Sequence, residues 1–469
     1  MWQIIQNEWR NLSRTKVLLG ISIGFVLILL VSVLLSNYQN QRQITAYQEA
    51  KEHLRSQWES IEAMNPHGAA HYGTYVFKPA NLLSSLDEGV NSITGNVIQV
   101  EGHVQNEMVH SEASQMQAVS RFGKLQSSLI LKYILPLLLI FLAYSSVSAD
   151  KESGRLKLLV LQGAKPNQLV LAKSVSVWLF GVALLLVVWS AYGILNFQSL
   201  SSAILLRSLL FLGSYALYYF IISGLTVFLS SRWQNHSVAL TSMLGVWIIW
   251  TIFLPNILLS SIEQNHPLPS RAEFQAAMKE DRSKGINGHN PADKRSETLK
   301  QKVLAEYGVD SLSQLPINFD GITMQADEEY GNQVWDKHFG HIREVITSQK
   351  RSLQLAGLFN PFVSLQNAST GFAATDNLHH QDFLIQVESY RRVFIKTLND
   401  KHAYGGSKTG DWGWEADNEF YRSIPDFDYQ PESVGSILPT YSLDIVMLGL
   451  WSLLTLGLLL FGSQKMHIL

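Results

Sequence analysis

The 469-residue sequence contains no cysteine. This absence excludes disulfide bonds, thiolate metal sites and cysteine nucleophiles. The sequence also lacks a surplus of basic residues, because 36 Lys and Arg stand against 38 Asp and Glu. A net charge of −2 offers no electrostatic footprint for a polyanion, so we expect no nucleic-acid partner.

A phosphate-binding motif is missing as well. The nearest match to a P-loop is Gly405-Gly-Ser-Lys-Thr409, in which Ser407 stands where the pattern requires glycine. Without a P-loop the chain is not expected to hydrolyse ATP. We therefore predict that it is not an enzyme and that it binds no cofactor of its own.

Long apolar runs dominate what is present. A helix rises 1.5 Å per residue, so about 20 apolar residues cross a hydrocarbon core of about 30 Å. Core helices of a soluble protein would rarely give six such runs in one chain. The sequence predicts six transmembrane helices, at residues 17–36, 129–149, 169–195, 203–230, 237–261 and 441–464. Charged residues stand at the ends of these runs, where they are expected to reach the membrane interface: Lys132, Lys173, Arg207 and Asp444.

The orientation of these spans follows from the distribution of Lys and Arg. These residues precede the first run, follow the sixth, and occupy the connections 150–168 and 231–236, whereas the short connection 196–202 has none. No small-x-small cleavage pattern follows the first run, so we read it as an uncleaved span. Both termini are predicted to be cytoplasmic, and segments 37–128 and 262–440 to lie outside.

The two outside segments have mainly helical patterns. Residues 38–64 and 101–128 are predicted to be helical around an irregular stretch, 65–100. The second segment shows helical stretches near 270–283, 291–307, 322–356 and 376–403. The predicted fold class is a mainly α membrane protein with two large, mostly helical extracytoplasmic insertions, between spans 1 and 2 and between spans 5 and 6.

The N-terminal residues 1–16 form an amphipathic pattern. Trp2, Ile5, Trp9 and Leu12 share one helical face, and polar residues occupy the other. Two tryptophans favour a helix lying in the inner membrane interface, in contact with the lipid bilayer. The alternative is a helix packed against another helix.

The connection at 150–168 begins with charged residues and continues with an apolar stripe through Leu156, Leu159 and Val160. A short helix held between two spans could dock into a groove of a soluble partner and transmit movement. On spacing alone, a connector without a partner is equally compatible.

The same connection resembles a known family. Glu152-Ser-Gly154, then Leu156-Lys-Leu-Leu159, a Gly-x-x-Pro turn and a new span are similar to the pattern of type-2 ABC transporter permeases. The resemblance implies that Glu152, Ser153, Gly154, Leu156 and Leu159 form a coupling helix. It also implies two copies of a separate ABC ATPase subunit, which would bind ATP and Mg²⁺, and a second permease copy or a related permease.

Motifs in the outside segments resemble a bacterial branch of that family with large periplasmic insertions, catalogued as a domain of unknown function. The resemblance implies a multi-pass protein of the bacterial inner membrane. It is carried by Asn65-Pro-His-Gly-Ala-Ala-His-Tyr-Gly73 and the residues after it, by Asp87-Glu-Gly-Val90, and by Ala374-Thr-Asp-Asn-Leu-His-His380. The motif residues include Asn65, Pro66, His67, His71, Tyr72, Gly73, Asp376, His379 and His380.

Histidines of the first motif have the spacing of metal ligands. His67 and His71 would share one face of a helix, although Pro66 and Gly68 argue against a regular helix there. A third ligand would come from a distance, from His103 or His110. The alternative is a hydrogen-bonded structural role, and His338 with His341 and His379 with His380 are weaker pairs of the same kind.

Three functions are compatible with these patterns. The first is the permease subunit of an ATP-driven exporter, or of an extruder that uses the stroke on a periplasmic or outer-membrane partner. The second is a membrane-anchored sensor or assembly factor without transport. The third is an anchored periplasmic metalloprotein that uses His67 and His71. The aromatic loop around Trp412 and Trp414 would touch lipid, bind a partner or simply pack.

Overall fold

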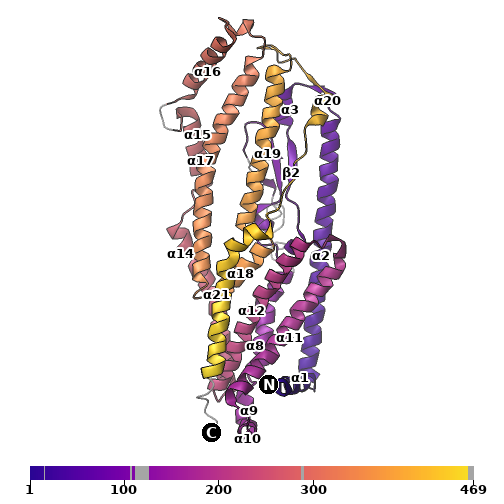
Figure 1. Ribbon diagram of the computed structural model, residues 1–469, viewed down its shortest axis with the longest axis vertical. Helices are drawn as coiled ribbons and strands as arrows, with labels where there is room; N and C mark the ends of the chain where they lie inside the picture. Colours follow the sequence, from indigo (N-terminus) through magenta and orange to yellow (C-terminus); the bar gives the residue numbers. More distant parts are fainter. Residues whose placement is uncertain (15, 106–107, 111–125, 287–289, 463–469) are drawn as a thin grey trace.

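The computed structural model describes residues 1–469 except 15, 106–107, 111–125, 287–289 and 463–469. The molecule is elongated, with a helical bundle at one end and an outer part at the other (Figure 1). The helix α1 (Trp2–Arg14) and the end of α21 (Val434–Phe461) both lie at the bundle end. This placement agrees with an even number of crossings.

Six helices among the described residues are long and apolar enough to cross a membrane. The chain is therefore mainly helical with six candidate spans, as the apolar runs predicted. They are formed by α2 (Lys16–Glu59); by α7 (Ser127–Leu129), η2 (Ile130–Ile134), α8 (Leu135–Ala143) and α9 (Ser148–Glu152); by α11 (Pro166–Leu195); by α12 (Ser202–Arg232); by α13 (His236–Ile248), η4 (Ile249–Phe253) and α14 (Leu254–Asn265); and by α21 (Val434–Phe461).

Two of these spans contain a π-helical turn directly before a proline. The turn η2 precedes Pro136, and η4 precedes Pro255. Proline lacks an N–H, and its ring collides with the carbonyl four residues earlier in an α-helix. A wider turn at that point relieves the collision and keeps the span continuous.

The bundle has one apolar core to which all six spans contribute. Its buried members include Leu29 on α2, Leu139 on α8, Val177 on α11, Tyr219 on α12 and Leu448 on α21. The helices α11, α12 and α21 lie in extensive contact with one another. This packing fixes the relative positions of spans that are far apart in the sequence.

The helix α2 is 44 residues long and continues without a break from the bundle into the outer part. Its outer half lies in the outer part and contacts α20 (Asn418–Ser423). The other helices of the second insertion in the outer part are α15 (Arg271–Lys284), α16 (Ala292–Tyr307), α17 (Phe319–Ala356) and α19 (Asn377–Tyr404). Shorter pieces are α1 (Trp2–Arg14), α3 (Pro66–Tyr72), η1 (Leu82–Ser85), α4 (Asn91–Thr94), α10 (Arg155–Leu161), η3 (Phe197–Ser199) and η5 (Leu312–Gln314).

A second core joins the two insertions into one outer unit. Trp58 of α2, Ala69 of α3, Ile98 of the sheet and Phe394 of α19 are all buried in it. The Trp58 indole also donates a hydrogen bond to the backbone oxygen of Tyr421, at 2.9 Å. The first insertion is therefore packed on the second.

Strands replace part of the helix predicted for residues 101–128. An antiparallel sheet has the order β2 (Thr74–Phe77), β3 (Val97–Val100), β4 (Met108–His110), and a second pair joins β1 (Ala63–Met64) to β5 (Ala416–Asp417). Among the described residues of 101–128, helix begins only at Ser127. The central strand β3 pairs with β2 and β4 and buries Ile98 and Val100, which alternate along it. The helix-forming composition of residues 101–128 did not reveal this sheet.

The second insertion also reaches into the bundle. The helix α18 (Pro361–Phe372) packs between α12 and α21, and Phe362 and Leu365 belong to the bundle core. At the turn before it, Asn360 donates to the backbone oxygen of Trp250 and Trp451 donates to that of Gly357, at 2.8 and 3.0 Å. The turn is level with inner parts of two spans, so segment 262–440 does not lie wholly outside the bundle.

Candidate functional site

The connection at 150–168 folds into two short helices that protrude from the bundle. The helix α10 lies at the extreme end of the molecule, beyond α1 (Figure 1). Gly154, at φ +69°, separates α9 from α10 in a left-handed conformation that side chains rarely adopt. The sharp bend it allows turns α10 away from the spans.

The apolar face of α10 differs from the predicted docking stripe. Leu156 is buried in the bundle core and Leu159 is half-buried against it, so neither side chain is free for a partner. Leu158 and Leu161 are 60% and 75% exposed. The helix therefore anchors itself through the predicted residues and presents two other leucines to its surroundings.

The remaining predicted coupling residues hold the bend in place. The Glu152 carboxylate lies 3.1 Å from Nδ1 of His236, at the start of α13. The Ser153 hydroxyl donates to the backbone oxygen of Ala149 at 2.8 Å and caps the end of α9. These contacts connect the bend to a neighbouring span.

A chain of ion pairs joins α10 to the N-terminal helix. Asp150 forms ion pairs with Arg155 at 3.2 Å and with Lys173 at 2.9 Å. Lys173 also forms an ion pair with Glu8, at 2.5 Å. Lys173 and Asp150 are both buried. The helices α1, α9, α10 and α11 are thus connected through Asp150 and Lys173. Sequence reasoning had placed Lys173 at a span end within reach of the interface.

The helix α1 packs against another helix, α11, as the alternative arrangement predicted. Ile5 is buried, and the Trp9 indole donates to the backbone oxygen of Ser176 on α11 at 3.3 Å. Trp2 is 64% exposed. The side chain of Leu12 lies outside the described residues. The helix packs on α11 and leaves one tryptophan free on the bundle surface.

A cavity of about 460 Å³ lies where the spans meet the outer part. Its lining includes a buried ion pair, Asp87 with Lys132 at 2.5 Å, and a partly buried one, Asp376 with Lys350 at 3.2 Å. Sequence reasoning placed Lys132 at a span end and did not pair these residues. The one signal available was a lysine within an apolar run, because ionisable groups inside membranes are commonly functional.

Asp376 organises the wall of this cavity. Its side chain caps α19 by accepting from the backbone N–H of His379 at 3.2 Å, and it also lies 2.8 Å from Nδ1 of His379 and accepts from the Tyr441 hydroxyl at 2.6 Å. Burial alone would raise the pKa of Asp376, but Lys350 and His379 hold it below its ordinary value. His380 is buried on the same turn, where burial and Lys78 lower its pKa to about 3.

The first motif forms a regular helix despite its proline and glycine. Asn65 caps α3 by accepting from the backbone N–H of His67 at 2.9 Å, and Pro66 occupies the first helical position, where its missing N–H costs nothing. Gly73 ends the helix at φ +64°. His67 and His71 therefore do share one face, contrary to the expectation from Pro66 and Gly68.

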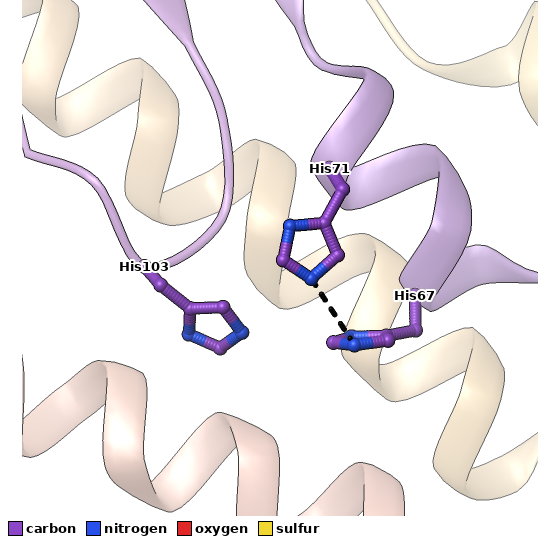
Figure 2. Close-up of side chains that lie close together, drawn as sticks. All are labelled: His67, His71 and His103. Atoms are coloured by element: carbon purple, nitrogen blue, oxygen red, sulfur yellow. Dashed lines mark hydrogen bonds between the residues drawn. The ribbon is translucent and has the colours of Figure 1, made fainter.

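The structure brings His67, His71 and His103 together (Figure 2). The Nε2 atoms of His67 and His71 are 3.2 Å apart. Burial and the neighbouring histidines lower the pKa of His67 to about 4. The side chain of His110, the other candidate for a third ligand, lies outside the described residues. Tyr72 is exposed and stacks on Trp58.

The other histidine pairs have separate partners. Nε2 of His338 lies 2.7 Å from Asp281, and His341 is exposed, 4.0 Å from Glu344. The aromatic loop is tied to the cluster, because the Asn65 side chain donates to the backbone oxygens of Trp412 and Trp414, each at 3.0 Å. Trp412 remains half exposed.

Comparison with known proteins gives one match. Residues 271–430 match the family model described as Domain of unknown function (DUF3526). The match covers α15 to α20 and agrees with a resemblance of the outside motifs to an uncharacterised family. No curated protein and no solved structure matches the chain.

Proposed function

We propose that this chain is the membrane-spanning subunit of an ATP-driven ABC exporter, or of an extruder that performs mechanical work outside the membrane. ATP would be hydrolysed by two copies of a separate subunit docked on α10. A second copy of this chain or a related permease would complete the assembly in the bacterial inner membrane.

The observation that carries the proposal is the construction of α10. It is a short helix at the end of the bundle, anchored by Leu156, connected by Asp150 and Lys173 to two other helices, and exposing Leu158 and Leu161. Two large exposed leucines on a helix so firmly braced favour a docking surface that transmits force over a passive connector.

Force applied to α10 has a continuous route into the bundle. The backbone N–H groups of Val147 and Ser148 donate to the Ser230 hydroxyl on α12, both at 3.1 Å, and Lys151 donates to the backbone oxygen of Ser231. The helix α12 packs in turn on α18 and α21, which hold the outer part. Movement at α10 would therefore displace α18, which lines the polar cavity.

The charged cavity supports a transport role. Two cations and two anions are paired where the largely apolar bundle meets the outer part, and removing such charges from water is costly. Rocking of α12 and α18 would separate Ser369 from Asp87, to which its hydroxyl donates, and change access to these pairs. A polar or charged cargo, or a moving outer segment, would interact with groups released in this way.

The test is co-purification of ATPase activity. The tagged full-length chain is purified from membranes of its own host, and ATP hydrolysis is measured in the eluate. The double variant Leu158→Asp/Leu161→Asp should lose the activity at least tenfold, because an interface that buries two leucines cannot accommodate two carboxylates. The matched control is Leu268→Asp, an exposed leucine of the outer part, which should retain it.

Two outcomes would contradict the proposal. If the intact wild-type chain elutes without any ATP hydrolysis, a membrane-anchored sensor or assembly factor explains the architecture better. If the double variant keeps wild-type activity, α10 is not the docking surface.

A further inference from the structure

We infer that His67, His71 and His103 form a binding site for a divalent transition-metal ion of the zinc class in the outer part of the molecule. This inference does not depend on the proposed ATPase partner. It rests on the positions of three imidazoles and on the side chains that hold them.

The spacing of the first two ligand atoms fits tetrahedral zinc. With Zn–N bonds of about 2.0–2.1 Å, two ligand nitrogens of a tetrahedral site lie about 3.3 Å apart. The Nε2 atoms of His67 and His71 are 3.2 Å apart. Their four-residue spacing on α3 produces this separation, because both residues lie on one face of the helix.

The third ligand comes from another part of the first insertion. One ring nitrogen of each histidine lies within 4.8 Å of the other two, and a nitrogen of His103 faces the pair (Figure 2). A small rotation of the His103 ring would complete three bonds to one ion. Three imidazoles without thiolate are a ligand set that suits zinc, copper or nickel.

The loop that carries His103 is held against α3 by a backbone hydrogen bond. The backbone N–H of Gly102 donates to the backbone oxygen of Ala70 on α3 at 2.8 Å, which holds the loop beside the helix. His103 itself has φ +63°, a strained conformation for a residue other than glycine. Such strain is retained where surrounding structure demands it, and it is common at ligand sites.

Glu328 of α17 supplies the outer partner that metal-binding histidines require. Its Oε1 atom lies 2.9 Å from Nδ1 of His103 and also accepts from the backbone N–H of His103 at 2.7 Å. A carboxylate on Nδ1 leaves Nε2 of the same ring free to bind an ion. Arg391 and Glu388, both buried, complete the group and balance its charge.

The fourth coordination position is open. His71 and His103 are exposed and His67 is half-buried, so the ion would face solvent on one side. Three protein ligands with an open position hold a water molecule or one donor atom of an incoming ligand. The ion would also tie the first insertion to α17 through His103 and Glu328.

The test uses the full-length chain in detergent on a histidine-free tag, stripped of metal and titrated with Zn²⁺ and with Co²⁺. We expect one ion per chain, and a Co²⁺ absorption band in the visible range typical of tetrahedral nitrogen ligation. His71→Ala and His103→Asn should abolish both signals; asparagine is chosen because it tolerates a positive φ. His341→Ala, an exposed histidine on a helix of the same outer part, is the matched control and should change nothing.

Glu328→Gln tests the positioning role. It should weaken Zn²⁺ binding about 10- to 100-fold while the three ligands remain in place. Should this variant fail to fold, His103→Asn still decides the matter, because that histidine is exposed. The inference is wrong if the wild type binds no ion, or if His71→Ala and His103→Asn bind Zn²⁺ as the wild type does.

Discussion

Lys173 is the residue whose removal should reveal how the bundle end is connected. Its ammonium group is 2.5 Å from Glu8 and 2.9 Å from Asp150, and its side chain is 5% exposed. Lys173→Met keeps the length of the side chain and removes its charge. Both carboxylates then lose their shared partner.

Two consequences follow, with different magnitudes. For α1, the loss is a hydrogen bond to a charged group, which contributes about 1.5–3 kcal/mol. Since each 1.4 kcal/mol is tenfold in an equilibrium constant, α1 should open about 10- to 100-fold more often. For the whole bundle, removing one partner of a buried pair costs about 3–5 kcal/mol; the Arg155 that remains beside Asp150 favours the lower end of this range.

Hydrogen–deuterium exchange read by mass spectrometry measures the first consequence directly. The amides of α1 should exchange 10- to 100-fold faster in Lys173→Met than in the wild type. Lys165→Met, the same change at an exposed position before α11, should leave them unaffected. For the bundle, thermal unfolding in detergent should show that Asp150→Asn in the Lys173→Met background restores part of the lost unfolding midpoint, because it removes a buried charge that has lost its buried partner and keeps only the exposed Arg155.

The reasoning would be refuted by unchanged exchange in α1 together with a double variant no more stable than Lys173→Met. That pair of results would mean that the ion pairs are incidental. The contacts of Ile5 and Trp9 alone would then hold α1 on α11.

Three further predictions concern other parts of the chain. Gly73→Ala should lower the unfolding midpoint and weaken Zn²⁺ binding, because the new Cβ would lie 2.3 Å from the backbone oxygen of Val100 and the residue has a positive φ. The control is Gly68→Ala at the start of the same helix, where the new Cβ would meet only Met64 Cγ at 3.9 Å; it should be neutral or stabilising by up to about 1 kcal/mol. Asp376→Asn keeps the helix cap but loses the ion pair to Lys350, so it should destabilise the protein by about 2–4 kcal/mol and lower its unfolding midpoint. Because folding lowers the pKa of Asp376, the difference in unfolding midpoint between wild type and variant should be constant from pH 7 to 5 and shrink only below about pH 4. Leu161→Cys and Tyr404→Cys are each the sole thiol of their variant. In intact cells a membrane-impermeant maleimide should label only Tyr404→Cys; labelling of Leu161→Cys from outside would contradict the proposed topology.

The elements that depend on local composition could be predicted from the sequence. The run 203–230 corresponds to α12, Ser202–Arg232, and the pattern at 291–307 corresponds to α16, Ala292–Tyr307. Apolar length and helix propensity are properties of a short window, so they can be read without knowledge of the fold. The same holds for the sharing of one face by His67 and His71 once Asn65 is recognised as a helix cap.

Contacts between distant segments could not be predicted. Lys132 and Lys173 were expected to reach the membrane interface, and both are buried because Asp87 and Asp150 meet them. Asp87 lies 45 residues from Lys132 along the chain, and Glu328 lies 225 residues from His103. No periodicity encodes such pairs. The depth of α18 was missed for a related reason, since 12 residues are too few to register as a span.

The unbroken course of α2 has a mechanical consequence. Forty-four residues at 1.5 Å each make a rod about 66 Å long, with its foot beside α1 and its head beside α20. Because the rod has no hinge, a tilt of about 5° at the foot would displace the head by roughly 6 Å. A displacement barely visible among the spans would thus become, at Trp58 and Tyr421, a shift larger than the diameter of a water molecule, and the outer part would act as the long arm of a lever.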